Sequence, residues 1–128
     1  MRVLRQTVLP ILLSGIWISI SEFVRNELLF KSYWVSHYQQ MGLTFPSEPI
    51  NGAMWGVWSL MLAGAIYSIS KKFSLLQTTL LAWFMAFVLM WVVIGNMGVL
   101  PFHLLFFAVP LSFLEVAVAA LILKKMSS

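Results

Sequence analysis

Four long apolar stretches dominate this sequence and limit what it can fold into. They cover residues of about 4–24, 50–70, 74–95 and 99–123. Each could cross the hydrocarbon core of a bilayer, which takes roughly 20 helical residues at about 1.5 Å per residue. None alternates apolar and polar residues as barrel strands do, so helices are expected. The sequence therefore predicts an all-α membrane protein, a single domain over residues 1–128 with four transmembrane helices.

Composition excludes a water-soluble protein. The chain is 61% hydrophobic and 9% charged, whereas soluble domains have roughly 25% charged residues. The net charge of +4 is better explained by orientation in a membrane than by nucleic-acid binding, because no basic patch is interleaved with aromatic residues. The sequence has no cysteine, which excludes disulfides and thiolate metal sites. We expect the lipid bilayer as the partner, and no nucleic acid.

Short turns and the basic residues predict the topology. Lys71-Lys72 separates the second and third spans, and residues 95–98 separate the third and fourth, so these spans form an antiparallel bundle with the first. One side of the membrane receives six of the eight basic residues: Arg2, Arg5, Lys71, Lys72, Lys124 and Lys125. By the positive-inside rule that side is the cytoplasm, and both termini are cytoplasmic.

The connection over residues of about 25–49 is the only long one, and it lies on the outer side. Its apolar positions recur at helical spacing: Phe30, Trp34, His37 or Tyr38, and Met41. We therefore predict an amphipathic helix lying on the outer membrane interface. Gly42 is expected to end this helix.

Glu115 lies inside the fourth predicted span, nine residues before Lys124 and thus roughly 13 Å from the cytoplasmic boundary. A charged carboxylate facing lipid costs roughly 3 kcal/mol or more, so Glu115 is expected to face protein, largely protonated. Small residues share its helix face: Ala108, Ser112 and Ala119. Counting from the cytoplasmic ends places Ser14 and Trp83 at similar depth. Glu115, Ser14, Ser112 and Trp83 form a candidate ligand or proton site.

Two interpretations of Glu115 stay open at this point. A neutral carboxyl could hold helices together by donating a hydrogen bond to Ser14, or to a backbone carbonyl freed by Pro110. Alternatively, Glu115 binds a proton or a cation, as intramembrane ionisable groups often do.

A second polar layer is predicted near the outer face. Glu22 and Arg25 are three residues apart on the first span and can pair. Asn51, Asn96 and His103 begin or end the other spans at similar depth. This layer could bind an anion, a headgroup or a small polar ligand, or it could reflect only the water at the interface. Two isolated histidines predict no metal site, and no motif predicts a cofactor or catalytic residues.

The second span carries a face of small residues: Gly52, Gly56, Gly64 and Ser68. Such a face packs closely against another helix, either within the chain or in a second protein. A homo-oligomer or a larger membrane complex is therefore among the expected partners.

The chain resembles small bacterial four-helix inner-membrane proteins of unknown function. The resemblance rests on the stretch from Ser21 to Trp34, on Asn51-Gly52 and on the segment from Pro110 to Glu115. It implies a bacterial inner-membrane location and no particular activity. Three hypotheses follow from the residues. The first is an accessory or binding bundle, the second a small proton- or cation-coupled transporter using Glu115, and the third a membrane enzyme with a polar site at the outer face.

Overall fold

The computed structural model describes residues 1–127, which are helical with short connections and contain no strand. Within these residues four helices are long and apolar enough to cross a membrane: Leu4–Leu29, Pro49–Ser70, Leu75–Asn96 and Phe102–Ser127. They have 22 to 26 residues each, which matches roughly 30 Å of hydrocarbon at about 1.5 Å per residue. The predicted all-helical class and the four apolar helices are confirmed.

The first long helix combines three segments, η1 (Leu4–Val8), α1 (Leu9–Phe23) and η2 (Val24–Leu29). The π-helical turn η1 precedes Pro10, whose missing N–H interrupts the α-helical bonding pattern. The helix continues through η2 to Leu29, beyond the predicted end of the first span near residue 24. Arg25 lies within the helix and is buried, because its charge is paired with Glu22 one turn earlier.

The helix α2 (Lys31–Gln40) forms within the predicted outer connection. Phe30 separates it from η2 and is buried against the start of the fourth long helix. The inward side of α2 contacts protein: Trp34 and Tyr38 pack on Phe45, and the His37 ring hydrogen-bonds the Gly98 carbonyl at 2.7 Å. Gly42 has a φ of 75° and ends the helical segment there, as predicted.

The next two long helices begin with side-chain caps. Glu48 and Asn51 bond reciprocally at the start of α3 (Pro49–Ser70), and Ser74 and Gln77 do the same at α4 (Leu75–Trp83). A π-helical segment, η3 (Phe84–Val88), joins α4 to α5 (Leu89–Asn96). Together α4, η3 and α5 form the third long helix.

The fourth long helix starts at the short η4 (Phe102–Leu104) and continues as α6 (Leu105–Ser127). Pro101 is extended and precedes this helix. A residue with an extended backbone cannot be part of a helix. The helix therefore begins after Pro101, and the first residues of the predicted span 99–123 lie outside it. At its other end α6 reaches Ser127, and Lys124 near this end donates to the Ser70 carbonyl at 2.9 Å.

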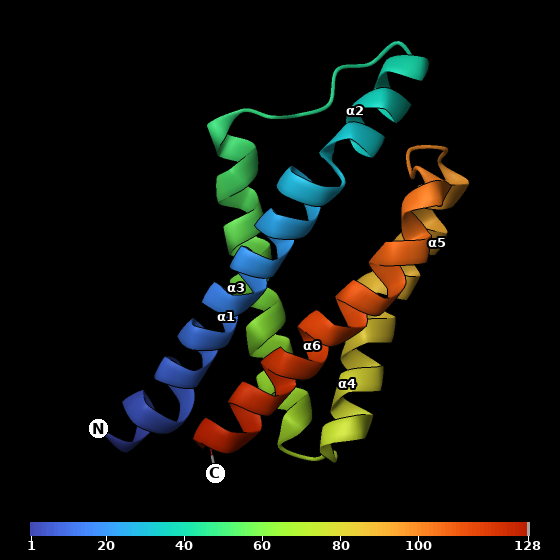
Figure 1. Cartoon of the computed structure of the whole chain (residues 1–128). Helices are drawn as coiled ribbons and strands as arrows, with labels where there is room; N and C mark the ends of the chain where they lie inside the picture. Colours follow the sequence, from blue (N-terminus) through green and yellow to red (C-terminus); the bar gives the residue numbers. More distant parts are fainter. Residues whose placement is uncertain (128) are drawn as a thin grey trace.

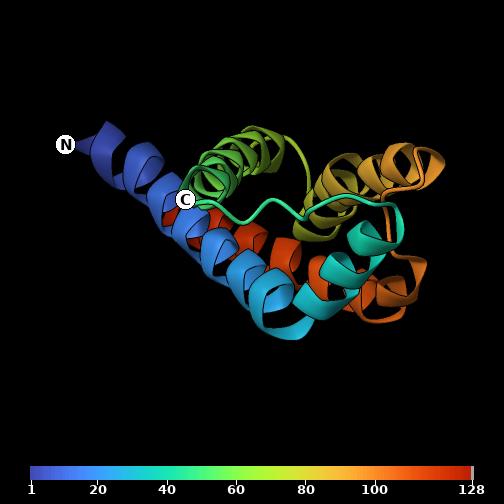
Figure 2. The ribbon, with the colours of Figure 1, turned by 90° about the horizontal axis from the view of Figure 1, so that it is seen from above.

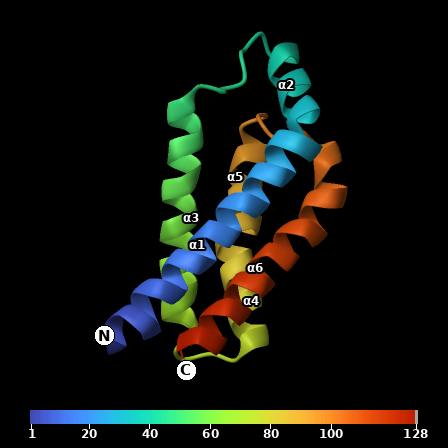
Figure 3. The same cartoon turned by 60° about the vertical axis from the view of Figure 1, so that its left-hand side comes forward.

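Both chain ends and the α3–α4 turn lie at one end of the molecule, and α2 with the segment leading to α3 lies at the other (Figure 1). The helix α6 is central, because it packs against α1, α3 and α4 (Figures 2 and 3). In addition, α1 packs against α3, and α3 against α4. Buried apolar side chains from these four helices meet in one core: Ile18, Leu62, Ala63, Ile66, Ala82, Val116, Ala119, Ala120 and Leu123.

Glycines have two different roles in this packing. A Cβ on Gly15 would lie 2.6 Å from the Leu60 side chain, so Gly15 permits the close approach of α1 and α3. By contrast, a Cβ on Gly52, Gly56 or Gly64 would meet no described atom within 4 Å. The predicted small-residue face of α3 is therefore not covered by another helix of the described chain.

Candidate functional site

A buried ion pair occupies the junction of α1 and η2. Arg25 forms an ion pair with Glu22 one helical turn before it, and Asn26 donates a hydrogen bond to the other Glu22 oxygen at 2.8 Å. Both members of the pair are at least nine-tenths buried, with Glu22 2% and Arg25 7% exposed. The spacings of three and four residues place all three side chains on one face of the helix. The expected pairing of Glu22 with Arg25 is thus present.

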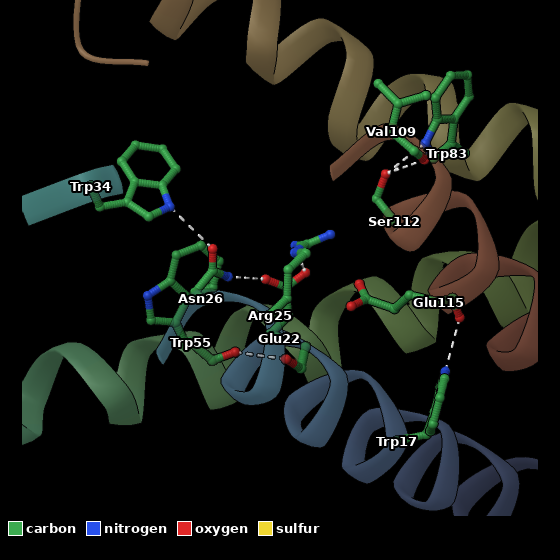
Figure 4. Close-up of polar contacts among 11 residues, drawn as sticks. Trp17, Glu22, Arg25, Asn26, Trp34, Trp55, Trp83, Val109, Ser112 and Glu115 are labelled. Atoms are coloured by element: carbon green, nitrogen blue, oxygen red, sulfur yellow. Dashed lines mark hydrogen bonds and ion pairs between the residues drawn. The ribbon is translucent and has the colours of Figure 1, made fainter. Parts of the chain in front are cut away.

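Glu115 points from α6 toward this pair. Its side chain is fully buried, and the close-up in Figure 4 shows its carboxyl directed at Glu22 and Arg25. The polar side chains around that carboxyl are those of Ser21, Glu22 and Arg25. Neither Glu115 oxygen has a hydrogen-bond partner among the described residues, and the same holds for Nη1 of Arg25. We refer to Glu22, Arg25, Asn26 and Glu115 as the polar cluster.

The polar cluster has unequal charges. It holds two carboxyl groups and one guanidinium, so it is neutral only if one carboxyl is protonated or another cation is present. The helical segments α3, α4, η3 and α5 cannot supply that charge, because they contain no acidic or basic residue. In α2, Lys31 pairs with Glu27 and the His37 ring bonds the Gly98 carbonyl. Unbalanced charge in a dry interior costs several kcal/mol. The arrangement therefore favours a protonated Glu115 or a bound cation.

Arg25 has a second contact, with an aromatic ring. Its guanidinium carbon lies 5.0 Å from the centre of the Phe87 ring, a cation–π geometry. Arg25 belongs to the π-helical segment η2 and Phe87 to η3. Single π-helical turns occur often at functional sites, where the wider turn redirects side chains. Nothing in the sequence pairs these two residues, so Phe87 was not predicted as a site residue.

The polar cluster is also connected to α2. The Trp34 indole donates to the Asn26 side chain at 3.3 Å, and Asn26 in turn donates to Glu22 (Figure 4). Asn26 was not among the predicted site residues. Its position four residues after Glu22 is the signal that could have identified it, because i, i+4 side chains meet on a helix.

The other residues predicted beside Glu115 are buried, or partly buried in the case of Trp83, but bond elsewhere. The Ser14 hydroxyl donates to the Ala119 carbonyl at 3.4 Å, and Trp83 donates to the Ser112 hydroxyl at 2.9 Å. The backbone carbonyl of Glu115 accepts from the Trp17 indole at 2.9 Å. The expected hydrogen bond from the Glu115 carboxyl to Ser14 is therefore absent from the described residues. The bonds of Ser14 and Trp17 connect α1 to α6, and the bond of Trp83 connects α4 to α6.

The residues of the predicted outer layer have different surroundings. Glu22 and Arg25 belong to the polar cluster, whereas Asn51 caps α3 through Glu48. Asn96 and His103 are exposed. Glu22 and Arg25 were predicted near the outer face and Glu115 nearer the cytoplasmic face, but in the structure the three side chains lie together.

Two apolar grooves open on the surface. One of about 300 Å³ lies between α3 and the third long helix, and its lining includes Trp58, Met61 and Met85. The other, of about 490 Å³, lies beside α5, and its lining includes Trp91 and Phe102. No member of the polar cluster lines either groove.

Comparisons with protein-family models, with curated proteins and with solved structures found no match to this chain. Any function of the chain must therefore be inferred from its residues and their geometry.

Proposed function

We propose that the four long helices form an antiparallel bundle in a bacterial inner membrane, with both termini in the cytoplasm and α2 along the outer interface. The support is the distribution of charge. The end with both termini and the α3–α4 turn has six basic residues and no acidic one among the described residues. Such an excess of lysine and arginine faces the cytoplasm in inner-membrane proteins.

Reporter fusions test this orientation. An enzyme reporter that works only in the cytoplasm should be active when fused after Lys72 or at the C-terminus. It should be inactive when fused at Thr44, between α2 and α3. A reporter that works only in the periplasm provides the matched control and should give the opposite pattern. Cytoplasmic activity at Thr44 would reverse the proposed orientation.

We further propose that the protein works through reversible binding of a proton or cation at Glu115, as a small proton- or cation-coupled transporter or binding protein. One observation carries this proposal: Glu115 is fully buried with both oxygens unpartnered, facing a pair that has no spare positive charge. No described residue forms a hydrogen bond with either Glu115 oxygen, while Glu22 and Ser21 lie near enough to interact with the carboxyl, so the carboxyl is not held by a fixed hydrogen bond. Because Glu115 is fully buried, exchange of its proton or cation requires a movement of the helices that opens the polar cluster to water.

Infrared spectroscopy of Glu115→Gln tests the site directly. Protonated carboxylic acids have a carbonyl stretch distinct from that of carboxylates and of glutamine. We expect the wild-type protein to show a pH-dependent carboxylic-acid band from a buried group, and we expect Glu115→Gln to lose that band completely. Glutamine keeps the shape of the side chain, so the variant should elute from size exclusion like the wild type.

Glu27→Gln is the matched control, because Glu27 pairs with Lys31 at 3.1 Å on the surface. This variant should keep the band of the buried acid. If Glu115→Gln also keeps it, Glu115 does not bind the proton, and its role is packing.

An accessory subunit of an oligomer or larger complex is the second candidate. It is favoured by the glycine face of α3, where Gly52, Gly56 and Gly64 have open space beside them. Small residues in an exposed row allow a helix of another protein to approach closely. No observation adds support to an enzyme at the outer face, because Asn51 caps α3 and Asn96 and His103 are exposed.

A further inference from the structure

The net charge of the polar cluster limits which ion can replace the proton on Glu115. The inference about this ion rests on the proposed proton or cation site. Ionised Glu115 leaves two carboxylates facing one guanidinium, a net charge of minus one. One proton or one monovalent cation brings the cluster to zero, whereas a divalent cation brings it to plus one. Because net charge is costly in a dry interior, the two neutral states are favoured.

The available ligand atoms agree with a monovalent cation. Glu22 is already engaged, with one oxygen on Arg25 and the other on Asn26. Neither Glu115 oxygen has a hydrogen-bond partner among the described residues, and Ser21 is one of the polar residues that influence the carboxyl. Carboxylate and hydroxyl oxygens are hard ligands that suit hard metal ions, and the same oxygens accept hydrogen bonds from an ammonium group. The charge balance, and not the ligand type, favours a monovalent ion over a divalent one. The oxygens that are free to bind a cation are therefore those of Glu115, and no nitrogen or sulfur ligand is among them.

The charges facing Glu115 come from one neighbouring helix. The first long helix contributes Glu22 and Arg25, while α3 and the third long helix contribute no charged residue. On α6 itself the next charged residue is Lys124, more than two helical turns away. Glu22 and Arg25 neutralise each other, so the charge on Glu115 is the one that an exchangeable ion has to balance.

We propose that Glu115 exchanges its proton for one monovalent cation, an alkali metal ion or a small ammonium, so that the two occupants compete one for one. The protonated carboxyl releases its proton to water as the cation binds the carboxylate. One positive charge leaves for each that enters, and the polar cluster stays neutral throughout. Ser21 is a positioning residue that offers its hydroxyl oxygen to the cation.

Proton release on cation addition tests the exchange. The full-length protein in non-ionic detergent is held in weakly buffered solution with a pH indicator. It is then titrated separately with lithium, sodium, potassium and methylammonium chlorides. We expect at least one of them to release close to one proton per chain. The half-saturating concentration should rise roughly tenfold for each pH unit of acidification in the acidic range, as one-for-one competition requires. The alkali ions and methylammonium separate the two chemical sources of the cation.

Three controls make the result decisive. Magnesium chloride at equal ionic strength should release no proton, and Glu115→Gln should release none with any salt. Ser21→Ala should keep the pH-dependent infrared band while its half-saturating cation concentration rises severalfold. The Ser21 variant removes only a hydroxyl, so it stays informative even if Glu115→Gln folds poorly.

The outcomes separate this inference from the proposed function. If no monovalent salt releases protons from a wild-type protein whose infrared band depends on Glu115, the exchange is wrong and the proton site stands. Equal release by magnesium would also overturn the exchange. If the band itself does not depend on Glu115, both proposals fail together.

Discussion

Arg25→Met is expected to lower the free energy of unfolding by about 3–5 kcal/mol, the usual cost of leaving one partner of a buried ion pair alone. The substitution removes the guanidinium that pairs with Glu22 and lies over Phe87. Methionine keeps a long flexible side chain, so most of the loss comes from charge and little from volume. Unfolding of the purified protein by a denaturing detergent, followed by circular dichroism, measures the effect.

The double variant Glu22→Gln with Arg25→Met is the control for this prediction. It removes both charges, so no ion is left buried without a partner, and most of the lost stability should return. Breaking a buried pair is costly mainly because of the charge that remains. If the double variant is as unstable as Arg25→Met, the cation–π contact and packing of Arg25 matter more than its charge.

Gly15→Leu is expected to lower the free energy of unfolding by about 1–3 kcal/mol, the range for overpacked interiors. A Cβ at this position would already lie 2.6 Å from Cδ2 and 3.4 Å from Cα of Leu60, and leucine adds three more carbon atoms. The backbones of α1 and α3 would have to separate. The same detergent titration gives the loss of stability.

Gly56→Leu is the matched control within the chain, because a Cβ on Gly56 meets nothing within 4 Å. Its stability as a monomer should stay close to that of the wild type. An equal loss in both variants would mean that the effect comes from glycine itself and not from the contact with Leu60.

Local patterns in the sequence predicted much of the candidate site. The stripe of Ala108, Ser112, Glu115 and Ala119 was expected to face inward, and all four residues are buried. Glu22 and Arg25 were expected to pair from their spacing, and they do. Both inferences concern one helix at a time, where residues three and four apart necessarily share a face.

The position of Glu115 relative to Glu22 was not predicted, and the reason is physical. Counting residues from the basic ends places Cα atoms at a depth and takes no account of where the side chains point. Helical side chains lean toward the N-terminus of their own helix. Because α1 and α6 run in opposite directions, Glu115 leans toward the end with α2, while Glu22 and Arg25 lean the other way. Side chains whose backbones lie at different depths therefore meet.

The hydrogen bond from Trp34 to Asn26 gives the polar cluster a connection beyond the four long helices. Asn26 holds one oxygen of Glu22, so the position of α2 and the charge state of the cluster belong to one thermodynamic cycle. Coupling in such a cycle is reciprocal. If the cluster binds a proton as proposed, a lipid or protein that displaces α2 and breaks this bond would change the proton affinity of the cluster. Binding of the proton or cation would, by the same free energy, change how readily α2 is displaced.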